Sequence, residues 1–119
     1  MNAVGIDVSK GKSMIAIMRP LGEVIATPFE VGHTAAELNE LAKFILKISG
    51  ETRVVMEYTG VYFEPNARAL YDAGLTVCVV HAQLIHNYGN NTIRKIKTDK
   101  ADAIKIANYA LDNWNKLKP

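Results

Sequence analysis

Four acidic residues in separate parts of the chain could together bind divalent cations. Asp99 and Asp102 stand three residues apart at the start of a long amphipathic segment, and this spacing puts both on one face of a helix. Asp7 closes the first apolar run of the chain, and Glu57 closes another at residues 52–57. Strand ends are where α/β sheets carry their chemistry. We therefore expect Asp7, Glu57, Asp99 and Asp102 to form one metal-binding and catalytic site.

The chemistry of such a site follows from its oxygen donors. All-carboxylate sites suit hard cations such as Mg²⁺ or Mn²⁺. Two of these ions about 4 Å apart stabilise the attacking and the leaving oxygen of a phosphodiester displacement. The predicted reaction is phosphoryl transfer on nucleic acid, with Mg²⁺ or Mn²⁺ as the cofactor.

Each acid also has an ordinary structural explanation. Asp99 and Asp102 could cap the helix and interact with its dipole, and Asp7 could begin a turn by bonding its own backbone. Glu57 is the hardest to explain in this way, because it follows the apolar residues 54–56 and a buried unpaired carboxylate is costly. Glu57 therefore carries most of the argument for a site.

A basic cluster lies next to two of these acids. The formal net charge of the chain is only +2, which does not by itself require a nucleic-acid partner. Within residues 94–100, however, four basic residues accompany a single acid. Such a cluster is usually a solvated surface, but its place beside Asp99 and Asp102 favours phosphate binding. The predicted nucleic-acid contacts are Lys10, Arg94, Lys95, Lys97 and Lys100.

The composition fits one globular domain. The chain has 119 residues, of which 49% are hydrophobic and 22% charged, enough to bury a core. It contains no apolar run of about 18 residues and no signal-peptide pattern at its start, so we expect a cytoplasmic protein without a membrane partner. The single cysteine, Cys78, lies in an apolar strand and is expected to be a buried core thiol.

The first half of the chain predicts an antiparallel meander followed by a helix. Residues 3–8, 13–18 and 23–31 are expected to be strands, the third broken near Pro28. Between the last two, Arg19-Pro20-Leu21-Gly22 matches a type I turn, with proline in the second position and glycine in the fourth.

A helix should follow these strands. Thr34-Ala35-Ala36-Glu37 is a capping-box signature, and apolar residues recur from there at helical spacing until Gly50.

The second half alternates strands and helices. Residues 52–57 are a β-branched strand, and residues 62–73 a helix with a proline in its first turn. Residues 75–80 are apolar throughout, which is typical of a central parallel strand buried on both faces. Residues 82–88 could form a short helix, and residues 89–92 a turn or mobile loop. The last helix begins at about Asp99, with a stripe formed by Ala103, Ile106, Ala107, Ala110, Trp114 and Leu117.

This order of elements is that of a ribonuclease H-like α/β fold. A three-stranded meander comes first, and parallel strands with flanking helices follow. In that order strands one and four are neighbours, so Asp7 and Glu57 should lie at adjacent strand ends. The last helix would bring Asp99 and Asp102 to them from the side.

Three motifs resemble those of the DEDD-type transposases of the insertion-sequence-110 family. They are Gly5-Ile6-Asp7-Val8-Ser9-Lys10, Glu57-Tyr58-Thr59-Gly60-Val61-Tyr62 and Lys97-Thr98-Asp99-Lys100-Ala101-Asp102-Ala103, in this order. Each is weak alone, but together they are specific and span nearly the whole chain. One departure is His81-Ala82, where Asn-Pro is common in the family.

The resemblance implies an N-terminal RuvC-like domain whose DEDD metal ligands are Asp7, Glu57, Asp99 and Asp102. The family are DNA recombinases guided by a bridge RNA, so the implied partners are donor and target DNA, the guide RNA and further copies of the chain. Their nucleophilic serine lies in a C-terminal domain, which we expect this chain to lack. Residues 1–119 are therefore expected to be one domain that cannot recombine DNA alone, since Ser9, Ser13 and Ser49 match no nucleophile motif.

Two other classes of function remain open at this point. Actin-like sugar kinases and ATPases share the core fold and begin with an aspartate before a phosphate-binding hairpin. Residues 7–11 are a poor version of that hairpin, because Ser9 stands where glycine is usually needed. The chain could also be a non-catalytic module for nucleic-acid binding or oligomerisation. Metal binding would distinguish a catalytic domain from a scaffold, and nucleotide binding would favour the kinase.

Overall fold

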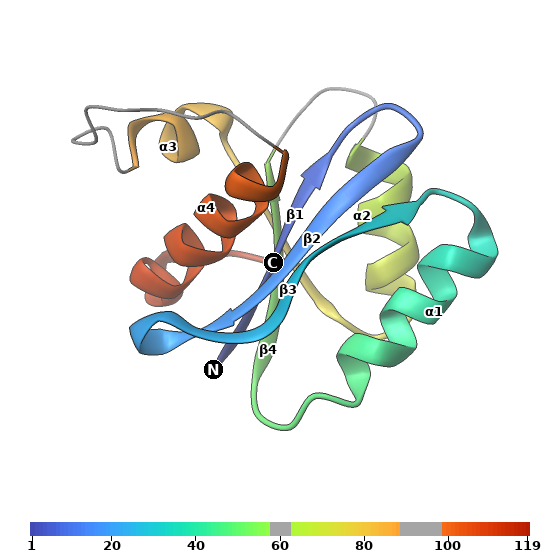
Figure 1. Cartoon of the computed structure of the whole chain (residues 1–119), viewed down its shortest axis with the longest axis horizontal. Helices are drawn as coiled ribbons and strands as arrows, with labels where there is room; N and C mark the ends of the chain where they lie inside the picture. Colours follow the sequence, from blue (N-terminus) through green and yellow to red (C-terminus); the bar gives the residue numbers. More distant parts are fainter. Residues whose placement is uncertain (58–62, 89–98) are drawn as a thin grey trace.

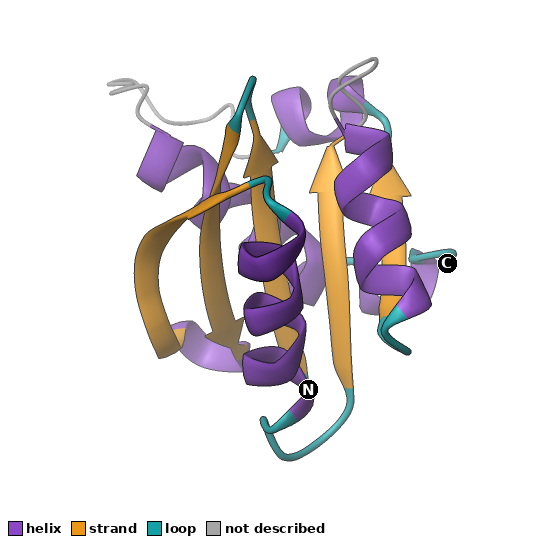
Figure 2. Ribbon diagram, turned by 90° about the vertical axis from the view of Figure 1, so that its right-hand side faces the viewer, coloured by secondary structure: helices purple, strands orange, loops and turns teal. Residues whose placement is uncertain are grey.

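A computed structural model describes residues 1–57, 63–88 and 99–119, with only the backbone given for Phe63 and Asp99. It contains a five-stranded mixed sheet in the order β3-β2-β1-β4-β5. Helices α1 and α2 cover one face of this sheet, and α4 covers the other (Figures 1 and 2). This three-layer arrangement is the predicted ribonuclease H-like architecture.

The predicted meander is present. Strands β1 (Asn2–Val8) and β2 (Lys12–Arg19) form an antiparallel hairpin, and β3 (Glu23–Gly32) pairs with β2 on its other side. Between the pairs Ile15–Phe29 and Ile17–Ala26 the register shifts, which places an extra β3 residue in the stretch that contains Pro28. The predicted break near Pro28 is thus a bulge on an edge strand, a position that tolerates proline.

The turn between β2 and β3 differs from the prediction. A type I turn would hold Leu21 near the right-handed helical region, but Leu21 has φ 65° and ψ 28°, the left-handed region. It is followed by Gly22 at φ 77°. The predicted turn type was wrong because proline and glycine mark a turn more reliably than they fix its type. The leucine side chain at this turn is fully exposed.

Helix α1 (Ala35–Leu46) begins with the predicted capping box. The Thr34 hydroxyl accepts a hydrogen bond from the Glu37 backbone N–H at 3.1 Å and donates to the Glu37 carboxylate at 3.0 Å. The same carboxylate accepts from the Gly32 N–H at 2.8 Å. Glu37 therefore joins the end of β3 to the first turn of the helix.

The parallel half of the sheet contains one correction. Strand β4 (Thr52–Glu57) pairs in parallel with β1 and with β5 (Thr76–Val80), and α2 (Phe63–Asp72) connects β4 to β5. Pro65 lies in the first turn of α2, as predicted. However, β5 is an edge strand and not a central one, and its Val79 side chain is exposed. Its continuous apolar run had suggested burial on both faces.

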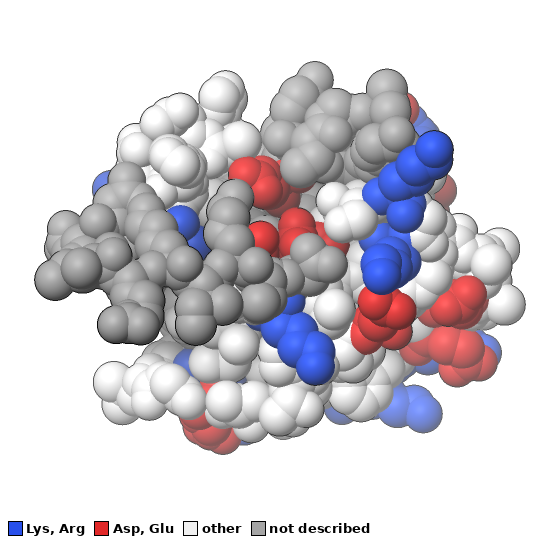
Figure 3. All heavy atoms as spheres, turned by 45° about the horizontal axis from the view of Figure 1, so that its top comes forward, with Lys and Arg blue, Asp and Glu red and all other residues white. Residues whose placement is uncertain are grey.

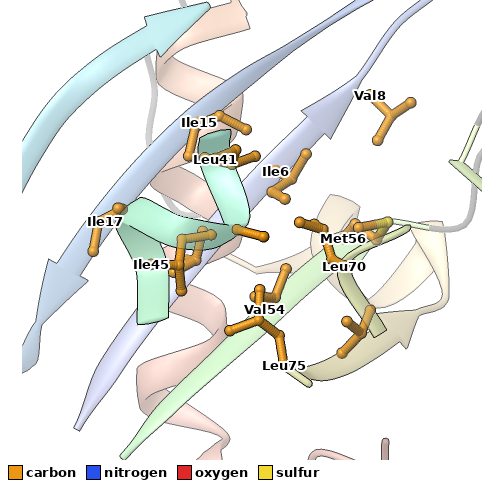
Figure 4. Close-up of a cluster of buried hydrophobic side chains, with 13 residues drawn as sticks. Ile6, Val8, Ile15, Ile17, Leu41, Ile45, Val54, Met56, Leu70 and Leu75 are labelled. Carbon is orange, nitrogen blue, oxygen red and sulfur yellow. The ribbon is translucent and has the colours of Figure 1, made fainter. Parts of the chain in front are cut away.

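The sheet separates two apolar cores. The larger core lies under α1 and α2, where side chains of β1, β2 and β4 meet Leu41, Ile45 and Leu70 (Figure 4). The second core lies under α4 and joins Ala3, Val55, Cys78, Ile106, Ala107 and Ala110, among others. Cys78 is the predicted core thiol, and burial raises its pKa.

The last part of the described chain holds α3 (Ala82–Asn87), α4 (Asp99–Asp112) and a short 3-10 helix, η3 (Trp114–Lys116). Trp114 is buried as predicted, but it lies beyond α4 and not on its stripe. The Arg53 guanidinium stacks 4.5 Å from the Trp114 ring centre and donates to the Trp114 carbonyl at 2.6 Å.

The turn or mobile loop predicted at residues 89–92 lies outside the described residues. Within the described residues, no helix has both the length and the apolar character needed to cross a membrane.

Candidate metal centre and nucleic-acid interface

Asp7 and Glu57 stand at the carboxyl ends of two adjacent parallel strands. The register between β1 and β4 runs from Asn2–Thr52 to Ile6–Met56. Asp7 and Glu57 are each the next residue after the last of these pairs. The sheet order therefore brings together two carboxylates that are 50 residues apart in the sequence. Both residues are half-buried.

Both carboxylates lie on the face of the sheet that α4 covers. Side chains alternate between the two faces of a strand, so Asp7 shares a face with Gly5, and Glu57 with Val55. Gly5 lies against α4, and Val55 belongs to the core beneath that helix. The antiparallel partner of Asp7 is Met14, which packs against Ala103 of α4. Asp7 is thus a neighbour of the first turns of α4.

A glycine allows α4 to approach the sheet closely. A Cβ on Gly5 would lie 2.6 Å from the Ala107 backbone nitrogen and even closer to the Ala103 carbonyl oxygen. Backbone atoms cannot move away as a flexible side chain can, so only glycine fits at this point. The short distance between β1 and α4 therefore depends on Gly5.

The direction of α4 brings its N-terminus to the acidic strand ends. Ala3, near the start of β1, packs with Ala107 and Ala110, whereas Met14, opposite Asp7, packs with Ala103. The helix therefore runs antiparallel to β1, as Figure 1 shows. Its first two turns lie at the same end of the sheet as Asp7.

The other two predicted ligands belong to this end of α4. Asp102 lies in its first turn and is half-buried, one helical turn before Ile106 of the second core. Asp99 is the first residue of α4, and its side chain lies outside the described part of the structure.

The described acids suit a hard cation by their chemistry. Asp7, Glu57 and Asp102 offer only oxygen donors, and each is half-buried at one end of the sheet. Within residues 1–57, 63–88 and 99–119, no three His, Cys, Asp or Glu side chains form a group that could hold a metal ion. The side chain of the fourth predicted ligand, Asp99, lies outside the described part of the structure.

Basic side chains accompany the acids. Lys10 is exposed in the turn between β1 and β2, three residues after Asp7, and Lys100 is exposed in the first turn of α4. Arg94, Lys95 and Lys97 lie outside the described residues. Figure 3 brings the carboxyl ends of β1 and β4 toward the viewer. Acidic side chains gather at the centre of this face, and lysine and arginine side chains lie around them.

Sequence reasoning missed a polar cluster on the opposite face of the sheet. The Ser13 hydroxyl oxygen lies 2.8 Å from His33 Nε2, and Asn66 Nδ2 lies 3.3 Å from the same nitrogen. Ser13, which matches no nucleophile motif in the sequence, thus has a histidine as its neighbour. Ser13 is only 4% exposed and lies on the α1 and α2 side, away from Asp7. The signal for the contact is hairpin register, because Ser13 pairs with Val31, two residues before His33.

The chain has His81-Ala82 where Asn-Pro is common in the family that it resembles, and the structure explains this difference. His81 is the N-cap of α3, and its Nδ1 accepts a hydrogen bond from the Gln83 backbone N–H at 3.2 Å. Asparagine is among the best N-cap residues, and proline is favoured at the first helical position. His81 therefore performs the capping role that asparagine would have, and Ala82 is compatible with the first turn.

Comparison with known proteins agrees with this geometry. A family model described as a transposase, for the DEDD domain of the insertion-sequence-110 type, matches residues 4–119. The solved structure of Thermus thermophilus RuvC is similar in fold, with a TM-score of 0.70, 14% identity, and coverage of 100% of this chain and 99% of that one.

RuvC of the same organism in complex with a Holliday junction substrate gives a TM-score of 0.70 at 13% identity, with the same coverage of both chains. No curated protein matches the chain in sequence. The family match spans nearly all of the chain, and the fold is RuvC-like. The chain therefore belongs to the DEDD transposase family of the insertion-sequence-110 type.

Proposed function

We propose that this chain is the metal-dependent phosphoryl-transfer domain of a DNA recombinase. The observation that carries the proposal is the placement of Asp7 and Glu57 at adjacent strand ends, one residue beyond the last β1–β4 pair, on the face where α4 begins. Membership of a transposase family favours this function over an actin-like kinase. It also favours a catalytic domain over a module that only binds nucleic acid or other copies of itself.

Asp7, Glu57, Asp99 and Asp102 are the proposed holders of Mg²⁺ or Mn²⁺. When bound, such ions stabilise the charge that develops on the attacking and leaving oxygens of a phosphodiester. The proposed role of the acids is to supply oxygen donors from rigid elements. Asp7 is fixed by its pairing with Met14 of β2 and Glu57 by its pairing with Val80 of β5, and the other two acids lie in the first turn of α4. Rigid placement of this kind is what a precise metal site needs.

The basic residues are proposed to hold the nucleic acid against this site. Lys10 and Lys100 are exposed on either side of the acidic group, on the hairpin turn and on α4 respectively. With Arg94, Lys95 and Lys97 they would contact phosphates, which position a duplex without reading its sequence. The positive end of the α4 dipole would add to the attraction for phosphate.

DNA is the proposed substrate. The RuvC that resembles this chain in fold was solved with a Holliday junction, and a branched DNA is therefore the first substrate to test. The resemblance to bridge-RNA-guided recombinases extends the proposal to a guide RNA, to donor and target DNA, and to a homo-oligomer acting in the cytoplasm.

Residues 1–119 are not expected to join DNA strands alone. Strand exchange must conserve phosphodiester energy, which a covalent enzyme–DNA intermediate does and hydrolysis does not. Ser13 is buried on the opposite face, and the Ser49 carbonyl accepts from Asn2 at the other end of β1. Within the described part of the chain, no histidine or lysine hydrogen-bonds to the Ser9 side chain. A nucleophilic serine would therefore have to come from elsewhere.

The test is a cleavage assay on labelled branched and linear duplex DNA with Mg²⁺ or Mn²⁺, resolved on a denaturing gel. We expect metal-dependent nicking that Asp7→Asn abolishes and that Asp72→Asn, a charge-matched change at the end of α2, leaves intact. Nicking that persists in Asp7→Asn would contradict the proposed site. Joined strands or a protein–DNA adduct would contradict the proposed absence of a nucleophile.

A further inference from the structure

Three polar side chains from separate elements meet beneath the end of the sheet that carries Asp7. Ser13 comes from β2, His33 from the connection between β3 and α1, and Asn66 from the first turn of α2. Ser13 is 4% exposed and Asn66 is 2% exposed. These are among the few buried polar residues in the described part of the chain, so their arrangement needs an explanation.

The His33 imidazole nitrogen Nε2 joins the two other side chains. It lies 2.8 Å from the Ser13 hydroxyl oxygen and 3.3 Å from Asn66 Nδ2, and the donor in each contact depends on the tautomer of the ring. His33 therefore joins β2 to α2. Without the imidazole the buried Ser13 hydroxyl would lose a hydrogen-bond partner, at roughly 1–3 kcal/mol for an unsatisfied buried group.

The cluster sits directly behind the proposed metal site. Ser13 is the antiparallel partner of Val8, the residue after Asp7, and its side chain continues the face of Ile15 and Ile17. Asn66 follows Glu57 by nine residues and belongs to the first turn of the next element. One end of the cluster is thus attached to the strand pair that holds Asp7, and the other to the helix that follows Glu57.

We propose that His33 is a positioning residue for the carboxylate pair. Its imidazole anchors the first turn of α2 to β2, and this anchor fixes the end of β4, with Glu57, relative to Asp7. The pairing of β1 with β4 ends at Ile6–Met56, and Glu57 pairs with Val80 of the edge strand β5, so contacts outside the β1–β4 pairing must set Glu57 relative to Asp7. The proposal rests on the metal-binding function proposed above.

The same contacts argue against a catalytic Ser13–His33 pair. A serine nucleophile must reach its substrate, and Ser13 is almost fully buried. Its hydroxyl shares the His33 Nε2 atom with Asn66, and the three side chains lie on the side of the sheet opposite to Gly5 and α4. Positioning is therefore the role that the geometry supports.

The test compares three variants of the chain. His33→Leu removes the polar partner of Ser13 and Asn66, whereas His33→Gln restores one, because the glutamine amide can donate or accept a hydrogen bond in the place of Nε2. Ile45→Val is the control: it lies near the other end of α1, in the same core, and is expected to lower stability by about 1 kcal/mol without touching the cluster. Mn²⁺ affinity by calorimetry and amide hydrogen exchange at residues 56 and 57 are the two readouts.

We expect His33→Leu to weaken Mn²⁺ binding by about fivefold and to speed exchange at residues 56 and 57 by at least as much. His33→Gln should return both values toward those of the parent, and Ile45→Val should change neither beyond its effect on global exchange. Parent-like binding and exchange in His33→Leu would overturn the proposal. If the parent itself binds no Mn²⁺, the proposed function fails, and hydrogen exchange alone still decides whether His33 fixes the end of β4.

Discussion

Asp7 and Glu57 are adjacent because of the register of the β1–β4 pair, and not because of any local sequence signal. Neither residue needs a special backbone conformation, since each continues a strand. Their common orientation follows from strand alternation, which directs both toward α4. The proposed site therefore needs no unusual backbone geometry at these two residues, because each acid lies at the end of an apolar strand. Backbone strain is found at another residue, Leu21.

Leu21 is the described non-glycine residue with a positive φ, at 65°, and its side chain is fully exposed. A left-handed backbone costs a leucine roughly 1–2 kcal/mol, and asparagine tolerates it better. We expect Leu21→Asn to stabilise the chain by about 0.5–1 kcal/mol, because no packing is lost. Urea denaturation measures this. Leu84→Asn, at an exposed leucine in α3, is the control and should bring no gain.

Tyr88 provides a prediction about alkaline pH. Burial, together with the hydrogen bond that its hydroxyl donates to Asp112, raises the pKa of Tyr88 from 10.0 to about 12. The folded state thus holds this proton more tightly than the unfolded state. The stability that Tyr88 contributes is complete below pH 10 and is lost as the pH rises through about 12.

Tyrosinate absorbance at 295 nm, compared between the parent and Tyr88→Phe, should reveal one late transition that only the parent shows. Stability measured from pH 10 to 12 should fall less steeply in the variant. Parent and Tyr88→Phe curves without a late transition that distinguishes them would contradict the account.

At the scale of elements, the contact between β1 and α4 determines where Asp102 lies. Gly5→Ala would place a methyl group against the Ala103 and Ala107 backbone, which must then shift. We expect a loss of at least about 2 kcal/mol and a weaker response to Mn²⁺, because the whole helix moves. Thermal unfolding with and without Mn²⁺ measures both effects.

Gly32→Ala is the matched control for Gly5. Its added methyl group would meet only the Glu37 carboxylate, which can move away. We expect this variant to lose part of the α1 cap and to keep its Mn²⁺ response. If Gly5→Ala behaved in the same way, the close approach of α4 would not matter for the site.

The elements that the sequence predicts well are those with a strong local signal. Residues 52–57 were recognisable as a strand because β-branched residues dominate them, and α1 because Thr34 and Glu37 form a capping box. The edge position of β5 was not recognisable, since an apolar run looks alike in a central and an edge strand. The Ser13–His33 contact depends on hairpin register, which the composition of the strands does not encode.

At the scale of the whole molecule, the proposed function depends on where charge is placed and not on how much there is. The net charge is only +2, and the described acids and lysines of the site occupy one end of the sheet. Nucleic-acid binding should therefore be weak and strongly dependent on salt. Four phosphate contacts, from Arg94, Lys95, Lys97 and Lys100, predict a slope of roughly −3 to −4 in log affinity against log salt on duplex DNA.

Replacing Lys95, Lys97 and Lys100 by Gln should flatten that slope, as fluorescence anisotropy with labelled duplex can measure. Lys43, Lys47 and Lys116, which lie on α1, at its C-cap and on η3, provide a control triple with the same change in charge. If both triples alter the slope equally, the effect belongs to net charge and not to this surface.

The most direct test of the metal site is the thermal stability of the chain in Mn²⁺. Mutual repulsion among the acids should destabilise the metal-free protein, and Mn²⁺ at ten times its Kd should stabilise it by about 1.4 kcal/mol, a rise in Tm on the order of 5 °C. Scanning calorimetry of the parent, Asp102→Asn and the charge-matched Asp72→Asn decides the matter. We predict that Asp72→Asn keeps the full Mn²⁺ shift and that Asp102→Asn loses most of it. An Asp102→Asn variant that responds to Mn²⁺ as strongly as the parent would mean that Asp102 only caps α4, and that the four carboxylates do not form one site.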